Sequence, residues 1–166
     1  MKKHRIFVAI NLPENIKGKL LSYKEKWPEL PVKWTKKENL HITLFFLGNI
    51  FEKELMNVLK ETQEFALKTS PFIVKLDKIS YFPNKQRAKY IFATGGKYHI
   101  TLGRIKPWEF RRIEEEDVPE ISEDINLDFG VDSIEVMESF LKRSGPEYAT
   151  LQSYKLINFS SLVIRN

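Results

Sequence analysis

Short apolar runs separated by turn residues recur along the chain and predict a protein built mainly of β-strands. The first run, residues 5–10, has the composition of a buried strand. The runs at 32–35 and 40–47 flank a short polar turn, so we expect them to form a hairpin. The remaining expected strands span residues 72–76, 78–82, 89–94, 97–105, 125–129, 133–141 and 154–163.

Two other segments show the 3.6-residue apolar spacing that is typical of amphipathic helices. The first begins near Pro13, a residue that the first turn of a helix tolerates, and ends at Pro28. The second covers residues 51–68. Their apolar positions are Ile16, Leu20, Leu21 and Trp27 in the first helix, and Leu55, Val58, Leu59, Phe65 and Ala66 in the second. Two helices among many strands predict an α+β fold on antiparallel sheet, with residues 1–166 as one domain of two lobes.

The pair Gly95-Gly96 separates two of the expected strands by only two residues. Tight two-residue hairpin turns favour positive φ at their central positions, which glycine adopts without a steric cost. We therefore expect residues 89–94 and 97–105 to pair antiparallel.

The composition narrows the class of protein. Apolar residues make up 42% of the chain and charged residues 30%, as in a soluble globular domain, and there is no cysteine for a disulfide or a thiolate metal site. The apolar runs are too short for a membrane span or a secretory signal, so we expect a cytoplasmic protein.

The charge is unevenly distributed. Residues 1–113 carry 23 Lys and Arg against 10 Asp and Glu, whereas residues 114–166 carry 4 against 12. The basic part suits an anionic substrate, although a lysine-rich surface is an equally simple explanation for most of these residues.

The tetrapeptide His-Ile-Thr-Leu occurs twice, at 41–44 and at 99–102. Side chains alternate across a strand, so His41 and Thr43 share one face, and His99 and Thr101 do the same in the second copy. The Ile and Leu of each copy point to the opposite face and anchor the strand in a core. We expect the two His/Thr pairs to face one cleft.

Two imidazoles at one cleft are suited to general acid–base chemistry on a phosphate ester, because one ring can accept a proton while the other donates one. The hydroxyls of Thr43 and Thr101 can hydrogen-bond phosphate oxygens. This chemistry needs no cofactor or metal, and without cysteine or a third suitable histidine a zinc site is a weak alternative. His4, in the basic N-terminal segment, is expected to be an exposed residue without a catalytic role.

Around these motifs the chain resembles the two-histidine (2H) phosphoesterases, most closely the LigT-like RNA 2′,3′-cyclic phosphodiesterases, also called 2′-5′ RNA ligases. The resemblance extends over nearly the whole chain and is carried by residues 5–13, 32–34, 38–48, 99–104, 137–141 and 145–148. It implies a bilobal fold with pseudo-twofold symmetry, antiparallel sheets and a central cleft. It also implies an enzyme that opens RNA 2′,3′-cyclic phosphate ends to a 2′-phosphate, with RNA ends or related nucleotides as its partners.

By this resemblance His41 is the proton donor to the leaving 3′ oxygen and His99 is the acceptor that activates water, with Thr43 and Thr101 holding the phosphate. The residues five positions beyond each histidine, Phe46 and Arg104, are implied to hold the terminal nucleotide. Strict alternation places both on the face opposite the histidines, so either the strands end or bulge before them, or Phe46 is a core residue and Arg104 a surface residue.

One departure from the family pattern lies before the second motif, where residues 94–98 replace a helix and its connections. The second lobe is therefore expected to be shortened. This leaves two alternatives to hydrolysis of RNA ends: a module that binds RNA ends or nucleotides with reduced or no turnover, or the same chemistry on another cyclic phosphate or a 2′-5′ linkage. We expect a monomer, with dimerisation or strand exchange through the shortened lobe as the alternative.

Overall fold

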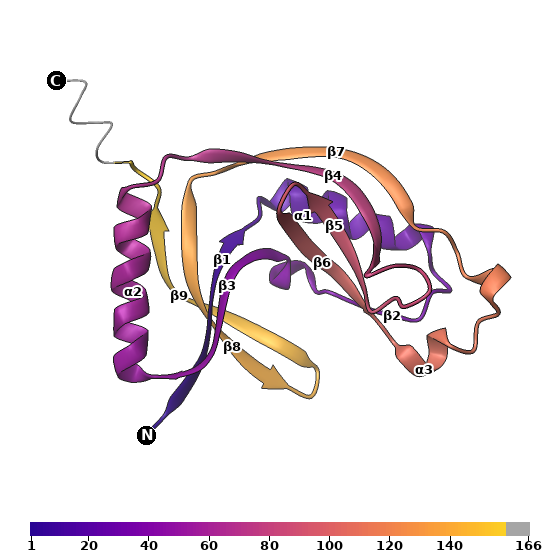
Figure 1. The fold of residues 1–166 in the computed structure, drawn as a ribbon, viewed down its shortest axis with the longest axis horizontal. Helices are drawn as coiled ribbons and strands as arrows, with labels where there is room; N and C mark the ends of the chain where they lie inside the picture. Colours follow the sequence, from indigo (N-terminus) through magenta and orange to yellow (C-terminus); the bar gives the residue numbers. More distant parts are fainter. Residues whose placement is uncertain (159–166) are drawn as a thin grey trace. The chain divides into compact units, whose positions relative to one another are not determined.

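The computed structural model describes residues 1–158 and divides the chain into two compact units, each built around one antiparallel sheet (Figure 1). The first unit comprises Met1–Asn11, Ile42–Ile73 and the described residues from Gly130 onward, and the second comprises Leu12–His41 and Val74–Phe129. The α+β fold with antiparallel sheets predicted from the sequence is confirmed. Among the described residues, no helix is both long and apolar enough to cross a membrane.

The sheet of the first unit has the strand order β3-β1-β8-β9. Its strands are β1 (Lys3–Asn11), β3 (His41–Phe51), β8 (Ser133–Lys142) and β9 (Gly145–Lys155). Helix α2 (Glu52–Leu67) packs against β1, β8 and β9 and buries a small core between itself and the sheet (Figure 1). That core is formed by Ile6, Val8, Ile50, Leu55 and Val136.

The sheet of the second unit has the order β2-β6-β5-β4-β7. Its strands are β2 (Val32–Trp34), β4 (Phe72–Phe82), β5 (Tyr90–Gly95), β6 (Tyr98–Ile105) and β7 (Ser122–Val131). The short helices of this unit are α1 (Glu14–Ser22), α3 (Pro107–Phe110) and the 3-10 turns Tyr23–Lys26, Lys37–Asn39 and Glu115–Asp117. Leu20 of α1 lines a small hollow with Trp34 of β2 and Leu102 of β6, so α1 covers the face of the sheet that carries these apolar residues.

Several strand expectations differ from the structure. The runs at 72–76 and 78–82 form the single strand β4. Residues 32–35 and 40–47 do not form a hairpin, because β2 pairs with β6 in the second unit, whereas β3 pairs with β1 in the first. Gly103 makes the β2–β6 pairing possible, since any Cβ at that position would lie 2.3 Å from the Val32 side chain. Among the described residues the last strand is β9, and residues 156–158 follow it without regular structure. Of the strand expected at 154–163, residues 154–155 therefore belong to β9, and residues 159–163 lie outside the described part.

The hairpin expected at the glycine pair is confirmed, with Gly95 opposite Tyr98 in the β5–β6 ladder. The two-residue turn consists of Gly96 and Lys97, one position later than predicted. Gly96 has a φ of 56° and Lys97 does not have a positive φ, which is the pattern of a type II′ turn. Gly95 is needed for a different reason: a Cβ there would lie 1.7 Å from the carbonyl oxygen of Lys75.

This close approach gives a first prediction. Replacing Gly95 with alanine forces β4 and β5 apart and is expected to lower the free energy of unfolding by about 3 kcal/mol or more. Gly18→Ala is the matched control, because nothing lies within 4 Å of a Cβ at that position in α1. It is expected to raise stability by roughly 0.5–1 kcal/mol. Urea denaturation of the two variants measures both effects, and equal stabilities would contradict the close approach at Gly95.

Candidate active site

The second His-Ile-Thr-Leu motif lies within β6. The register of β6 against β5 shows which residue is opposite each of its side chains. His99 is opposite Thr94, Ile100 is opposite Ala93, and Thr101 is opposite Phe92. Ile100 is fully buried and His99 is exposed. The expected division of this strand into an apolar anchor and a polar His/Thr face is therefore confirmed.

A β-bulge follows immediately. Thr101 is opposite Phe92, but Gly103 is opposite Ile91, so Leu102 is an extra residue in β6. Both carbonyl groups at this point are held by Thr35, whose hydroxyl donates to the oxygen of Thr101 at 2.9 Å and whose backbone N–H donates to the oxygen of Leu102 at 2.9 Å. An extra residue reverses the alternation of the side chains beyond it.

The bulge determines where Arg104 points. Arg104 is opposite Tyr90 on β5, and Tyr90 shares a face with Phe92 two residues later. Arg104 is therefore on the same face as Thr101 and His99, and its side chain is exposed. Of the two possibilities left open by the sequence, the strand bulges before Arg104.

The first His-Ile-Thr-Leu motif forms the start of β3. Ile42 is 1% exposed and Leu44 packs against the core under α2, which confirms the apolar anchor of this copy as well. The boundary between the two compact units falls between His41 and Ile42. His41 is thus in the same unit as His99, Thr101 and Arg104, whereas Thr43 and Phe46 belong to the other unit.

Phe46 is not a core residue, because 57% of its surface is exposed. The guanidinium of Arg5 lies 4.8 Å from the centroid of its ring. Arg5 precedes the buried Ile6 on β1 and so leaves the sheet on the face opposite α2. A cation stacked on an exposed ring is an arrangement that can also accept a planar ligand.

The imidazole of His41 has a fixed orientation. Its Nδ1 lies 2.7 Å from the carbonyl oxygen of Asn39. Since a carbonyl only accepts hydrogen bonds, Nδ1 carries a proton, and Nε2 is the atom through which this ring exchanges protons. Asn39 is itself buried at the end of the 3-10 turn that precedes β3.

The surroundings of His41 favour its neutral form. Burial lowers the pKa of its imidazole below the ordinary value, and the hydrogen bond to Asn39 only partly opposes this effect. The positive charges of His99 and Lys17 lower the pKa of His41 further. His99 therefore belongs to the electrostatic environment of His41.

Lys17 was not among the residues selected from the sequence. Its side chain is 6% exposed, and its ammonium group lies 3.8 Å from the carboxylate of the exposed Glu14. In a sequence, a lysine on the buried side of an amphipathic helix, one position after Ile16, is the signal that would have identified it. Its charge acts directly on His41, which makes it part of the electrostatics of the site.

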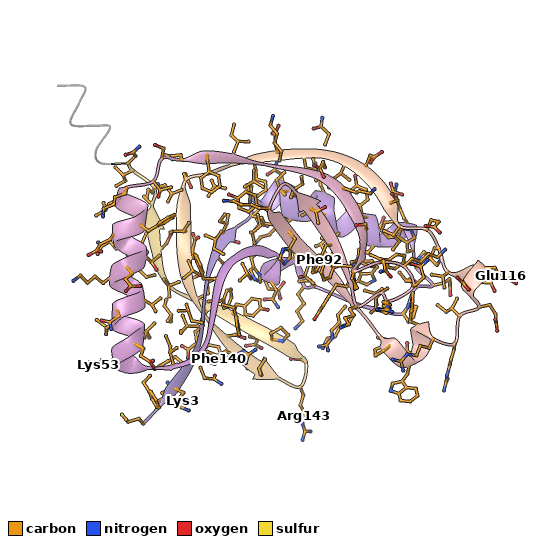
Figure 2. All side chains as sticks on the ribbon, in the orientation of Figure 1. Lys3, Lys53, Phe92, Glu116, Phe140 and Arg143 are labelled. Atoms are coloured by element: carbon orange, nitrogen blue, oxygen red, sulfur yellow. The ribbon has the colours of Figure 1, made fainter. Side chains whose placement is uncertain are left out.

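His99 has a neighbour that the sequence did not indicate either. Its ring stacks on Phe92, with centroids 4.6 Å apart and an angle of 24° between the planes. Phe92 stands on β5, diagonally across the ladder from His99, and is labelled among the side chains of this sheet in Figure 2. The stack limits the rotation of the imidazole.

The expectation that His4 is an exposed bystander is wrong as regards its position. It is 9% exposed, its Nδ1 lies 2.8 Å from Glu138, and its Nε2 lies 3.3 Å from Glu52. Its neighbours Lys3 and Arg5 made this strand look like a polar tail, but β1 starts at Lys3 and buries alternate residues. The contacts of His4 are those of a structural residue.

Comparison with known proteins identifies the family. The model of the LigT-like phosphoesterases matches residues 10–92. The chain belongs to this family.

Curated members of similar length carry the same activity in their names. The chain is 29% identical over 177 residues to an RNA 2′,3′-cyclic phosphodiesterase of Methanocaldococcus jannaschii, covering 90% of this chain and 99% of that protein. It is 26% identical to the enzyme of the same name from Aquifex aeolicus, covering 94% of this chain and 99% of that one.

Solved structures share the fold. A crystal structure from Thermus thermophilus superposes with a TM-score of 0.79 at 26% identity, covering 92% of this chain and 97% of that one. Escherichia coli LigT in complex with 3′-AMP superposes with a TM-score of 0.73 at 19% identity, covering 93% and 99% of the two chains, which shows the similarity of fold alone.

The charge of Lys17 gives a prediction for this site. Replacing Lys17 with glutamine removes a positive charge that disfavours the imidazolium, so the pKa of His41 is expected to rise toward its ordinary value. Proton NMR titration of the His41 ring in the free protein measures the shift. Lys19→Gln, an exposed position on the same helix, is the control and is expected to leave the titration unchanged. An unchanged pKa in Lys17→Gln would contradict the electrostatic link.

Proposed function

We propose that this protein hydrolyses the 2′,3′-cyclic phosphate at RNA ends to a 2′-phosphate, using its two repeated histidines as acid and base. The observation that carries the proposal is the placement of both imidazoles in one compact unit, within electrostatic reach of one another. The family of the chain and the names of its relatives support the choice of a cyclic phosphate as substrate.

In the proposed reaction His99 accepts a proton from water, and the water oxygen attacks phosphorus. The bond between phosphorus and the 3′ oxygen breaks, and His41 donates the proton from its Nε2 to that oxygen. The 2′ oxygen keeps the phosphate. The hydroxyls of Thr43 and Thr101 hydrogen-bond the non-bridging oxygens, on which negative charge grows in the transition state.

The electrostatics of the free protein bear on the role of His41. A proton donor must be protonated when the substrate is bound, yet burial and neighbouring cations lower the pKa of this ring. An anionic phosphate close to the imidazole favours the protonated form and opposes that effect. We therefore propose that substrate binding and protonation of His41 are coupled, so that the ring becomes a donor only when the phosphate is in place.

Phe46 and Arg104 are proposed to hold the terminal nucleotide. Both are exposed, and each offers a flat surface on which a base can stack, a phenyl ring in one case and a guanidinium in the other. Arg104 also carries the charge to contact a phosphate, and the bulge at Leu102 turns it toward the face of His99.

Binding without turnover is the less favoured alternative. It would require the short connection at Gly95-Gly96 to displace His99 from the sheet. In the structure His99 is paired with Thr94 in a regular ladder and stacked on Phe92. Action on another cyclic phosphate or on a 2′-5′ linkage uses the same groups, and a substrate panel that identifies the position of the product phosphate separates these reactions.

The proposal predicts EDTA-resistant hydrolysis of nucleoside 2′,3′-cyclic phosphates with a bell-shaped dependence on pH. His41→Ala and His99→Ala are each expected to lower kcat by a factor of about 10²–10⁴, because each removes one general acid or base. The assay is chromatographic separation of the 2′- and 3′-phosphate products. His4→Gln removes the third histidine and, corrected for the folded fraction, is expected to retain kcat. Undiminished turnover in both alanine variants would refute the proposal.

A further inference from the structure

The face of the second sheet that carries His99 also carries a series of aromatic rings. Beyond the contact between His99 and Phe92, the ring of Phe92 lies 5.4 Å from that of Tyr90, with 19° between their planes, and 4.8 Å from that of Phe82, with 20°. The rings therefore form one nearly parallel stack that runs from His99 on β6 across β5 to Phe82 at the end of β4.

The stack is closed in the middle and open at its far end. Phe92 is 9% exposed, because its neighbours cover it on several sides, whereas Phe82 is 49% exposed. Tyr90, which also stacks on Phe92, is half-buried. An exposed aromatic ring that continues an ordered stack offers a planar surface with little conformational entropy left to lose.

Two cations complete the same face. Phe82 is opposite Tyr90, Tyr90 is opposite Arg104, and Arg104 is opposite Lys33 on β2. Residues directly opposite one another point to the same side of a sheet, so these four side chains form one row across four strands. Within residues 1–158, neither Arg104 nor Lys33 forms an ion pair, and both are exposed.

The row is close to the reacting groups without coinciding with them. Tyr90 and Thr94, which is opposite His99, are four residues apart on β5, a separation of about 13 Å along a strand. Thr101 and Phe92 lie between the two positions. An RNA chain whose cyclic phosphate lies at His99 and whose terminal nucleotide is held by Arg104 can extend to the open end of this row with the nucleotide that precedes it.

We propose that the row Phe82, Tyr90, Arg104 and Lys33 is a subsite for the single-stranded RNA that precedes the cyclic phosphate. An upstream base stacks on the open end at Phe82 and Tyr90, while Arg104 and Lys33 contact the backbone phosphates. Aromatic faces beside cations are the combination by which proteins bind single strands without reading their sequence. The subsite makes an RNA oligonucleotide, rather than a free cyclic nucleotide, the preferred substrate. This preference rests on the proposed function.

The experiment compares kcat/KM for a 2′,3′-cyclic mononucleotide with that for a tetranucleotide ending in the same group. The unchanged protein is expected to favour the tetranucleotide by about tenfold or more. Phe82→Ala is expected to remove most of this advantage while changing kcat/KM for the mononucleotide less than about twofold. Trp108→Ala is the matched control, because Trp108 is 75% exposed on α3 and outside the row, and it is expected to keep the full advantage.

Lys33→Gln tests the same row through charge and does not depend on how well Phe82→Ala folds. It is expected to reduce the slope of log kcat/KM against log salt for the tetranucleotide by about 0.7, the loss of one phosphate contact. Lys19→Gln, an exposed lysine on α1, is expected to leave the slope unchanged.

Equal kcat/KM for the two substrates in the unchanged protein would overturn the subsite and leave the proposed function intact. So would equal losses on both substrates in Phe82→Ala. If neither substrate is turned over, the proposed function fails, and the subsite is then tested by titrating a 3′-phosphorylated tetranucleotide against a nucleoside 3′-monophosphate. Tighter binding of the tetranucleotide that Phe82→Ala abolishes would support the subsite, and equal binding would overturn it.

Discussion

The arrangement of the candidate site depends on the single extra residue in β6. Without the bulge at Leu102, Arg104 would follow the alternation of the strand and point toward the face that α1 covers, where Leu20, Trp34 and Leu102 line an apolar hollow. With it, His99, Thr101 and Arg104 occupy one face. Thr35, the residue that follows β2, donates hydrogen bonds to both carbonyl groups of the bulge and so stabilises it.

A second constraint is electrostatic. His99 and Lys17 are basic groups that act on His41 in one unit, and burial adds to the cost of charging the His41 ring. A site of this kind favours a bound anion, since a phosphate relieves the repulsion among its neighbours. Burial and the same repulsion lower the pKa of His41 when no anion is bound. Affinity for phosphate and control of the proton on His41 therefore have one physical origin.

The sequence was sufficient to predict what depends on local spacing. Alternation within each His-Ile-Thr-Leu motif predicts which residues anchor the strand, and this is confirmed. The glycine pair predicts the β5–β6 hairpin, which is also confirmed. The partner of β2 was not predictable, because a polar turn of four residues between two strands is typical of a hairpin. Only the space beside Gly103, which is visible in the folded sheet, shows why β2 lies against β6 instead.

The environment of the histidines was beyond prediction for a related reason. Phe92 is an ordinary apolar residue of a buried strand in the sequence, and Lys17 is one lysine among many. Each acquires its role from a neighbour that is more than 5 residues away in the chain, His99 in one case and His41 in the other. The repeated motif therefore identifies the reacting groups. The orientation of the His99 ring depends on the sheet, and the proton affinity of His41 depends in part on α1. A variant that keeps both His-Ile-Thr-Leu motifs but loses Phe92 or Lys17 retains the reacting groups without the surroundings that orient His99 and set the pKa of His41.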